Sequence, residues 1–359
     1  MTLCEVKVEV GNSPYMVRIG KESLSWIGVQ LRDLDIPLTR RVIVVADANV
    51  VDHHSEKVML SLDQAGFEPI LWKVPSGEGS KSIGQLEPIL SFMAKHRIDR
   101  SGAVIALGGG VTGDLAGFVA AIYLRGIALI QAPTTLLAMV DSSVGGKTGV
   151  NLREGKNLVG SFHQPSLVVV DLITLQTLPP RELAAGMAEV IKHGCIADRK
   201  LFDKVAAGQT EDLAPIIQRN VEIKAEVVKI DPFETNGRRA TLNFGHTLGH
   251  AIENAAGYGS LLHGEAVAIG MRAAAHLSKK KCGLSGEEVG AIEAAIKVNN
   301  LPLTASGISR ETIRAAMKLD KKAKSGVNRW VLLPKIGQTV LREDIKSEDV
   351  EELLDLVLT

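Results

Sequence analysis

Short apolar segments alternate with helical patterns through the first half of the chain. The segments that read as buried strands of a parallel sheet are 41–46, 69–74, 103–107, 127–131 and 167–170. Between them, 55–65 and 83–95 carry apolar residues at helical spacing. Two further strand patterns, 6–10 and 15–19, flank a Gly-Asn-Ser-Pro turn and predict a hairpin. This alternation predicts a doubly wound α/β domain.

Strand patterns become rare after Leu178, where helical spacing dominates. The expected helices are 181–193, 213–230, 264–281 and 286–298, together with a stretch rich in histidine. One late strand pattern covers 329–333. The sequence therefore predicts an α/β protein of two domains, a nucleotide-binding domain over 1–178 and a mainly helical domain over 179–359.

The charge and cysteine content limit which kinds of ligand the chain could bind and in which compartment it could work. The chain of 359 residues has 41 basic and 41 acidic side chains, so it has no overall field for nucleic acid, and an anionic ligand needs a local cationic cluster. Three widely spaced cysteines fit a reducing compartment better than a disulfide framework. The first residues lack a secretory pattern, and the apolar run 126–140 is interrupted by polar residues and Pro133. We expect a cytoplasmic protein without a membrane segment.

Three of the nine histidines lie within eighteen residues of one another. His246 and His250 are four apart and share one helix face, and His263 follows a glycine-rich break that could fold a second helix back onto the first. One interpretation is a group of helix histidines without a ligand. The other, which we favour, is a catalytic metal site, because three nitrogens, or two with a carboxylate, hold a divalent ion and leave a position open.

A glycine-rich turn follows the expected strand 103–107. The residues Gly108 to Gly113 satisfy G-x-G-x-x-G and open a helix, where backbone amides can receive a pyrophosphate. The acidic residue expected about twenty positions later is missing, although Asp47 ends an earlier strand. A plain turn is an equally good interpretation of this motif alone.

Other loops mix glycine with hydroxyl and lysine side chains, over 133–137, 141–149 and 155–160, which suggests backbone close to a ligand. Lys147 in Gly-Gly-Lys-Thr is not part of a P-loop, since Asp141 occupies the position of the required glycine. The lysine cluster at 320–324 is, on charge alone, a solvated face.

Taken together and in this order, the motifs resemble the 3-dehydroquinate synthase family, within the wider group of sugar phosphate cyclases. The resemblance covers most of the chain and is carried by 75–81, 108–117, Arg125-Gly, 133–137, 141–151, 155–160, 181–192 and 243–271. It implies an NAD- and metal-dependent lyase that converts 3-deoxy-D-arabino-heptulosonate 7-phosphate to 3-dehydroquinate and phosphate. The implied cycle is oxidation by NAD, phosphate elimination, reduction by the same NADH, ring opening and aldol closure, in a cleft between the domains.

The resemblance also implies site residues. For the cofactor NAD they are Asp47, Asn49, Glu78, Lys81, Gly109, Gly110, Val111, Asp114, Thr134, Thr135, Asp141, Lys147, Lys156, Thr177 and Leu178. For the metal, zinc with cobalt as a functional substitute, they are Glu189, His246 and His263. For the substrate and catalysis they are Arg125, Asp141, Lys147, Asn157, Lys192, Lys224, Arg239, Asn243, His250 and Lys321 or Lys322.

Spacing alone pairs His246 with His250, and the resemblance instead assigns His250 to the substrate. It also implies a homodimer in which Arg125 reaches the phosphate of the neighbouring subunit. One segment departs from the family pattern, because the nine residues from Asp231 to Arg239 are one more than usual. We expect this loop to bulge, which leaves the alignment of Lys224 and Asp231 less secure.

Three alternatives remain open at this stage. A sister cyclase acting on another sugar phosphate would keep both the NAD and the metal motifs. A metal-dependent polyol dehydrogenase has a related architecture, but its neutral substrate does not account for the lysines and arginines. The third alternative is a non-catalytic protein that binds metal and NAD, but such a protein does not account for the cationic residues.

Overall fold

The computed structural model describes residues 4–11, 13–257, 260–323 and 329–359, and it divides into two compact units. The first unit comprises Met1–Pro179 and Asn220–Phe233, and the second comprises Pro180–Arg219 and Glu234–Thr359. The chain passes between units after residues 179, 219 and 233. The first of these positions is one residue beyond the expected boundary, but the grouping of 220–233 with the first unit was not expected.

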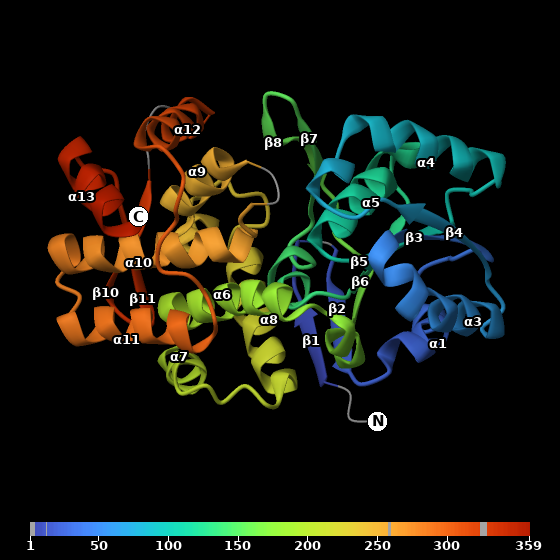
Figure 1. Cartoon of the computed structure of the whole chain (residues 1–359). Helices are drawn as coiled ribbons and strands as arrows, with labels where there is room; N and C mark the ends of the chain where they lie inside the picture. Colours follow the sequence, from blue (N-terminus) through green and yellow to red (C-terminus); the bar gives the residue numbers. More distant parts are fainter. Residues whose placement is uncertain (1–3, 12, 258–259, 324–328) are drawn as a thin grey trace. The chain divides into compact units, whose positions relative to one another are not determined.

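A seven-stranded sheet forms the centre of the first unit (Figure 1). Its strands are β1 (Cys4–Val8), β2 (Tyr15–Gly20), β3 (Arg41–Asp47), β4 (Glu68–Val74), β5 (Ala103–Gly108), β6 (Ala128–Pro133) and β9 (Leu167–Asp171). The order is β1-β2-β9-β6-β5-β3-β4, and every pair is parallel except β1–β2. The predicted hairpin is thus confirmed at the edge of the sheet, with its first strand two residues earlier than expected.

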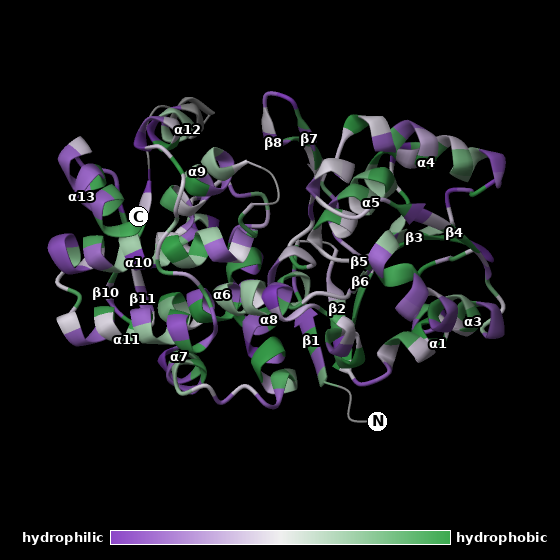
Figure 2. Cartoon of the chain, viewed as in Figure 1, coloured by the Kyte–Doolittle hydropathy of each residue, from purple (hydrophilic) through white to green (hydrophobic). Residues whose placement is uncertain are grey.

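The sheet is buried on both faces. Along β3, Val42, Val44 and Ala46 belong to one apolar core, and the alternate residues Ile43 and Val45 belong to another. Helices α1 (Ile27–Arg32) and α3 (Glu56–Gln64) contribute to the first core, and α4 (Ile83–Lys95) and α5 (Gly110–Ile122) to the second. In Figure 2, α3 and α4 carry both hydrophilic and hydrophobic residues, as helices covering a sheet must. The expected doubly wound α/β arrangement is confirmed.

Short helical turns fill the connections of this unit. They are α2 (Ala48–Val50), the π-helices η2 (Val51–Ser55) and η5 (Ala138–Ser142), and the 3₁₀ turns η1 (Ser23–Trp26), η3 (Glu78–Ser80), η4 (Tyr123–Arg125) and η6 (Leu172–Thr177). The elements η3, η5 and η6 carry residues that the resemblance assigns to the ligands.

A two-stranded hairpin replaces part of what the sequence analysis expected to be loop. Strands β7 (Lys147–Leu152) and β8 (Gly155–Phe162) pair antiparallel, with Gly149 opposite Gly160. A Cβ at Gly160 would lie 2.2 Å from the carbonyl oxygen of Thr148, so the glycines allow this close pairing. Glycine carries no hydrophobic signal, and for that reason the hairpin was missed.

The second unit is mainly helical, as expected. Its elements are α6 (Pro180–Ala197), α7 (Arg199–Ala206), the 3₁₀ turn η7 (Arg239–Asn243), α9 (His246–Ala256), α10 (His263–Cys282), α11 (Gly286–Val298), α12 (Arg310–Ala323), β10 (Trp330–Lys335), β11 (Gln338–Arg342) and α13 (Ser347–Val357). Helix α8 (Leu213–Ile230) contains the boundary between 219 and 220.

Helix α10 is the central element of this unit and packs against α6, α9, α11, α13 and β10. Many of its residues are small and buried, such as Gly264, Ala266, Gly270 and Ala274. Small side chains let neighbouring helices approach closely, and this packing brings the first residues of α9 and α10 near each other. Among the described residues, no helix has both the length and the apolar composition needed to cross a membrane.

Candidate active site

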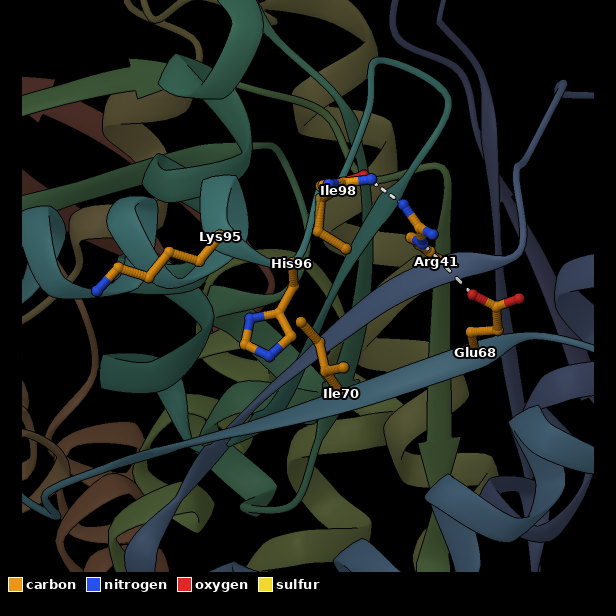
Figure 3. A pocket seen from close by; sticks show the side chains of 7 residues that line it. Arg41, Glu68, Ile70, Lys95, His96 and Ile98 are labelled. Carbon is orange, nitrogen blue, oxygen red and sulfur yellow. Dashed lines mark hydrogen bonds and ion pairs between the residues drawn. The ribbon is translucent and has the colours of Figure 1, made fainter.

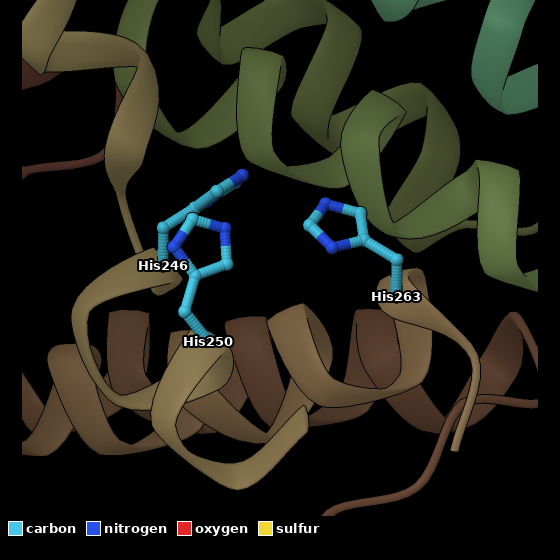
Figure 4. A group of neighbouring side chains, drawn as sticks. All are labelled: His246, His250 and His263. Carbon is cyan, nitrogen blue, oxygen red and sulfur yellow. The ribbon is translucent and has the colours of Figure 1, made fainter. Parts of the chain in front are cut away.

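A carboxylate and three imidazoles converge in the second unit. Glu189 lies in the middle of α6, His246 and His263 are the first residues of α9 and α10, and His250 lies one turn into α9. Figure 4 shows the three imidazole rings grouped together, and one nitrogen of each lies within 4.8 Å of the others. The folded-back second helix expected from the glycine-rich break is therefore present.

The spacing around Glu189 fits a metal ion. Its Oε1 atom lies 3.6 Å from Nε2 of His246 and 3.6 Å from Nε2 of His263. These distances are too long for hydrogen bonds, so Oε1 of this fully buried carboxylate faces both imidazoles without accepting from either, while Oε2 pairs with Lys192. Two ligands held at 2.0–2.1 Å by one tetrahedral zinc ion are about 3.4 Å apart. The donor set and its spacing match such an ion.

Glycines on α10 make this convergence possible. A Cβ at Gly264 would lie 1.9 Å from the carbonyl oxygen of Ala185, so the start of α10 lies directly on α6. Ala185 is one turn before Glu189, and Gly264 directly follows His263. Likewise, a Cβ at Gly270 would lie 2.0 Å from the carbonyl oxygen of Gly245, the residue before His246. Backbone contact between helices thus sets the separation of the three groups.

Buried charges surround the carboxylate. Lys192, one turn further along α6, forms an ion pair with Glu189, and both side chains are fully buried. Burial raises the pKa of Glu189, but Lys192, His263 and His246 outweigh it and hold that pKa well below its ordinary value. The group is therefore a carboxylate, the form that binds a metal.

The two imidazoles near Glu189 differ electrostatically. Burial, together with Lys192, holds the pKa of His246 well below its ordinary value, so its ring is neutral. Burial also lowers the pKa of His263, but Glu189 and Glu253 outweigh it and raise the pKa to about 10. A metal ion at this site would have to displace the proton of His263.

The structure brings Glu189, His246 and His263 together, and it also brings His250 to the same place. The His246 and His250 rings are 5.0 Å apart between centroids, and the His250 and His263 rings are 5.7 Å apart. Spacing alone and the resemblance therefore both predicted true neighbours. Whether His250 contacts the metal or the substrate stays a prediction.

Other predicted substrate residues of this unit lie on η7. Arg239 begins this turn and is buried, and Asn243 ends it. The turn η7 contacts α6, the helix that carries Glu189 and Lys192. The side chains of Lys321 and Lys322 lie outside the described part of the structure, so their roles remain predictions.

In the first unit, the predicted cofactor residues lie at the carboxyl ends of neighbouring parallel strands. Asp47 ends β3, Gly109 follows β5 and is the N-cap of α5, and Thr134 follows β6. Thr134 donates a backbone hydrogen bond to Gly108, and a Cβ at Gly109 would lie 3.1 Å from the side chain of Thr135. The turn is therefore held close to β6, with the start of α5 available to an anion.

A polar network joins several of these residues. Lys81 forms an ion pair with Asp114, and its Nζ donates to Oδ1 of Asn157 at 2.6 Å. Nearby, Nδ2 of Asn151 donates to Glu78 at 2.7 Å, and Lys156 lies 3.9 Å from the same carboxylate. Burial raises the pKa of Asp114, although Lys81 opposes this effect. The network links η3, α5 and β8.

Other predicted cofactor residues of this unit lie at the end of β3, in α2, at the end of η6 and at the start of α5. Oδ1 of Asp47 accepts from the backbone of Asn49 at 2.8 Å and from Ser76 at 2.6 Å, which fixes its orientation. The Thr177 hydroxyl lies 2.8 Å from Nε2 of the buried His54. Gly110 and Val111 open α5, and Leu178 follows η6.

Lys224 and Asp141 form a buried contact within the first unit. Nζ of Lys224 donates to the backbone oxygen of Asp141 at 2.5 Å and to its Oδ1 at 2.6 Å. Lys224 lies on the part of α8 that groups with the first unit, whereas the sequence analysis placed it in the second domain. The unit to which Lys224 belongs therefore differs from the one expected. Its assignment to the substrate remains a prediction.

The longer loop after α8 contains an aromatic contact. Phe233 and Phe162 meet edge to face with ring centroids 5.6 Å apart, and Phe162 lies opposite Lys147 in the β7–β8 pair. Glu234 and Gly237 have positive φ values of 58° and 82°. Both values lie in the left-handed region, and the bulge relative to the family pattern stays a prediction.

Arg125 stands on strained backbone. Its φ is 69° and that of Leu124 is 49°, a conformation that costs energy in any residue with a Cβ. Arg100 supports the turn by donating to the carbonyl of Leu124 at 3.3 Å. The Arg125 side chain is exposed, as a residue that serves a neighbouring subunit would have to be.

One hollow of the first unit lies away from the residues predicted to bind the ligands. It is lined by Arg41, Glu68, Ile70, Lys95, His96, Arg97 and Ile98 (Figure 3). Arg41 and Glu68 begin β3 and β4, at the opposite end of the sheet from Asp47. No residue predicted to bind a ligand lines this hollow, so its presence does not indicate the active site.

Solved structures with the same fold define the class. A 2-epi-5-epi-valiolone synthase from Streptomyces hygroscopicus, with NAD⁺ and Zn²⁺ bound, superposes with a TM-score of 0.87 at 29% identity, covering 95% of each chain. A 2-deoxy-scyllo-inosose synthase complexed with carbaglucose-6-phosphate, NAD⁺ and Co²⁺ shares the fold with a TM-score of 0.84 at 24% identity, covering 98% of this chain and 99% of that one. The chain has the fold of the sugar phosphate cyclases.

Sequence comparison places the chain more narrowly. Family models described as 3-dehydroquinate synthase N-terminal and C-terminal match residues 71–185 and 186–323. A 3-dehydroquinate synthase of Methylacidiphilum infernorum is 48% identical over 98% of both chains. One of Symbiobacterium thermophilum is 46% identical, covering 96% of this chain and 98% of its own. The chain belongs to the 3-dehydroquinate synthase family, as the motifs predicted.

Proposed function

We propose that this enzyme converts 3-deoxy-D-arabino-heptulosonate 7-phosphate to 3-dehydroquinate and phosphate, using NAD and a divalent metal ion. Family membership supports this activity. The structural observation that carries it is the buried Glu189 carboxylate, which faces two imidazole nitrogens at 3.6 Å. One carboxylate oxygen and two imidazole nitrogens at this spacing are well suited to a shared metal ion.

Glu189, His246 and His263 would hold the metal, because they offer three ligand atoms at suitable spacing and a mixed nitrogen and oxygen donor set. Zinc is the ion we expect, with cobalt as a functional substitute. When bound, the metal would act as a Lewis acid toward substrate oxygens, and NAD would accept and return a hydride. One glutamate charge leaves the site cationic toward an anionic substrate.

The first unit has the features of a dinucleotide site. The turn after β5 directs the start of α5 toward a pyrophosphate, and a Cβ at Gly110 would lie 3.0 Å from Oγ of Ser142, which leaves little space beside the backbone. Asp47 and the network around Lys81 supply polar groups for the sugars. We propose that residues 1–179 and 220–233 bind NAD and that the second unit binds the metal.

Each unit contains polar or cationic side chains that the resemblance assigns to the anionic substrate. Lys192 and Arg239 are buried, and buried cations interact strongly with carboxylates and phosphates. Lys147, Lys224 and Asn157 would contribute from the first unit. His250 and Asn243 would orient the substrate or move protons, since both carry groups that donate and accept hydrogen bonds.

We also propose a homodimer, with Arg125 completing the site of the neighbouring subunit, and a cytoplasmic location. The exposed and strained turn at Arg125 supports the first proposal. Mixing an Arg125→Ala variant with a His246→Ala variant tests it, because hybrid dimers would contain one intact site. Activity no greater than that of the separate variants would contradict it.

Phosphate release tests the activity. The protein is incubated with NAD, zinc and heptulosonate phosphate, and phosphate is measured over time. Heptulose and octulose phosphates serve as controls, since a sister cyclase would prefer another sugar phosphate. Release from the heptulosonate phosphate above all others is the expected result, and release from none would support a protein without catalysis.

The fate of NAD separates a cyclase from a dehydrogenase. The substrate that is oxidised at the start of the cycle is reduced again before release, so NAD should act as a catalyst. With NAD at a small fraction of the substrate concentration, we expect many phosphates per NAD and no accumulation of NADH absorbance. NADH formed in step with product would instead indicate a polyol dehydrogenase.

A further inference from the structure

Glu253 is a carboxylate beside the metal cluster that the sequence analysis did not single out. It lies on α9, seven residues after His246 and three after His250, so it shares their helix face. Its Oε2 atom lies 3.0 Å from Nδ1 of His263, the first residue of the next helix. Its side chain is largely buried, with 14% of its surface exposed.

The contact determines which nitrogen of His263 can bind an ion. A carboxylate accepts hydrogen bonds and cannot donate one, so Nδ1 of His263 must carry its proton toward Glu253. The other nitrogen, Nε2, is the atom that lies 3.6 Å from Oε1 of Glu189. The pairing with Glu253 therefore makes Nε2 the nitrogen that would give up its proton and bind the proposed metal.

The second imidazole has a different partner. Nδ1 of His246 lies 3.2 Å from the backbone carbonyl oxygen of Phe244, two residues earlier, which also leaves Nε2 to face Glu189. A backbone carbonyl is neutral, whereas Glu253 has a full negative charge. The carboxylate therefore adds a second negative charge near a divalent ion, directly beside its ligand His263.

We propose that Glu253 is a positioning residue of the metal site, which orients His263 and increases its affinity for the ion. The inference rests on the proposed metal site and assigns Glu253 no contact with the substrate. It also explains how the two helices hold one site, since Glu253 joins α9 to the first residue of α10 across the turn between them.

The chain offers a matched control. Glu293 on α11 lies 3.1 Å from Nε2 of His276 on α10, which is another carboxylate–histidine contact between helices of the second unit. Neither residue belongs to the metal cluster. The Glu293→Gln variant should therefore change folding stability without changing metal affinity.

The experiment measures zinc affinity by competition with a chromophoric chelator. We expect Glu253→Ala to weaken zinc binding by about tenfold to hundredfold, in the range found when such orienting partners are removed. Glu253→Gln keeps an acceptor oxygen and loses the charge, so it should lie between Glu253→Ala and the unchanged protein. Circular dichroism of each variant shows whether the fold is intact.

A second measurement reports geometry without turnover. Cobalt is loaded into each protein, and its visible absorption bands, which respond to ligand arrangement, are recorded. The bands should shift in Glu253→Ala and remain unchanged in Glu293→Gln. Zinc affinity within about twofold of the unchanged protein, with unshifted cobalt bands, would overturn the role of Glu253.

The outcomes separate this inference from the proposed function. Weaker metal binding in Glu253→Ala supports the inference even if no sugar phosphate yields phosphate, a result that would overturn only the activity. Unchanged metal binding with normal phosphate release overturns only the inference. An unchanged protein that binds neither zinc nor cobalt would overturn both the inference and the metal site.

Discussion

The metal cluster and the nucleotide region hold their polar groups in different ways. In the first unit, Lys81 forms an ion pair with Asp114 and donates a hydrogen bond to Asn157. The groups expected to face a phosphate there are backbone amides at the start of α5. In the second unit, Glu189 pairs with the buried Lys192, and its Oε1 faces two imidazole nitrogens at 3.6 Å, beyond hydrogen-bond distance. The first arrangement is satisfied without its ligand, and the second has a geometry that an ion would complete.

This difference predicts different responses to change. A site made from backbone and a bonded network should lose affinity in small steps, because each side chain is one of several contacts. A site made from three converging ligands should fail when one ligand or one helix contact is lost. The following variants test this contrast, beginning with the largest expected effect.

Gly264→Ala should affect the second unit most strongly. The added Cβ would lie 1.9 Å from the carbonyl oxygen of Ala185, so α10 must move away from α6. We expect a loss of at least ~3 kcal/mol in the free energy of unfolding, the upper end of overpacking costs, and loss of zinc. Denaturant unfolding and zinc content measure this.

The control is Gly290→Ala on α11, where no described atom apart from the adjacent residues and nearby backbone of the same helix lies within 4 Å of the added Cβ. This exposed helix position should be stabilised by up to ~1 kcal/mol, because alanine is the better helix former. If the two variants had the same free energy of unfolding and the same zinc content, the helix contact at Gly264 would not determine the position of the metal ligands.

Glu189→Gln should weaken zinc binding by about tenfold or more, because a neutral amide is a poorer ligand of almost the same size. The buried Lys192 would also lose its negative partner, so we expect a lower free energy of unfolding as well. Zinc content after dialysis is the measurement, and full retention of zinc would remove Glu189 from the metal site.

Arg239→Lys should reduce kcat/KM by about tenfold, the loss of one charge-assisted hydrogen bond. Lysine keeps the charge and loses the planar fork that binds a carboxylate or phosphate through two nitrogens. Steady-state phosphate release measures the effect. Unaltered kinetics would indicate that the longer loop places Arg238 or another cation against the substrate.

Lys81→Met should raise the Kd for NAD by about fivefold, which corresponds to roughly 1 kcal/mol. The variant removes the cation shared by Asp114 and Asn157 and leaves the second unit untouched. NAD titration followed by calorimetry tests this, and zinc content should stay the same. A loss of zinc would break the contrast between the two units.

The last prediction concerns pH and the buried His54, which contacts Thr177 in the first unit. Burial lowers the pKa of His54 to about 4, below the ordinary value near 6.5. The unfolded chain then binds more protons between these values, so this contribution to stability is complete above about pH 6.5 and falls as the pH drops toward 4.

Unfolding midpoints measured at pH 7 and pH 5 should differ less in His54→Gln than in the unchanged protein. The comparison uses the difference between the two pH values, because other groups titrate in both proteins. An identical pH dependence of the two proteins would show that His54 does not contribute.

Regular elements with a strong periodic signal were predictable from the sequence. The expected bounds of α4, α8 and α11 agree with the structure, and the parallel pairing of the strands agrees with the β-α-β alternation. The hairpin β7–β8 was missed because Gly149 and Gly160 carry no apolar signal. Helix α7 was missed as well, since it is only eight residues long.

The metal cluster was predictable only in part. Histidine spacing indicated that His246, His250 and His263 share one place, but nothing in local spacing points to Glu189, which was found through the family resemblance. The contact between Glu253 and His263 depends on how α10 lies against α9, which glycines such as Gly270 determine. Such contacts between helices are set by backbone packing and leave no periodic pattern.

The three passages of the chain between the units have a mechanical consequence. Because the segment 220–233 belongs to the first unit, neither unit is one continuous stretch of sequence. A single proteolytic cut between 180 and 219 leaves both resulting fragments with parts of each unit. A gene divided at residue 179 encodes a first unit that lacks Lys224 and its bond to Asp141. No single cut of the chain therefore separates one complete unit from the other.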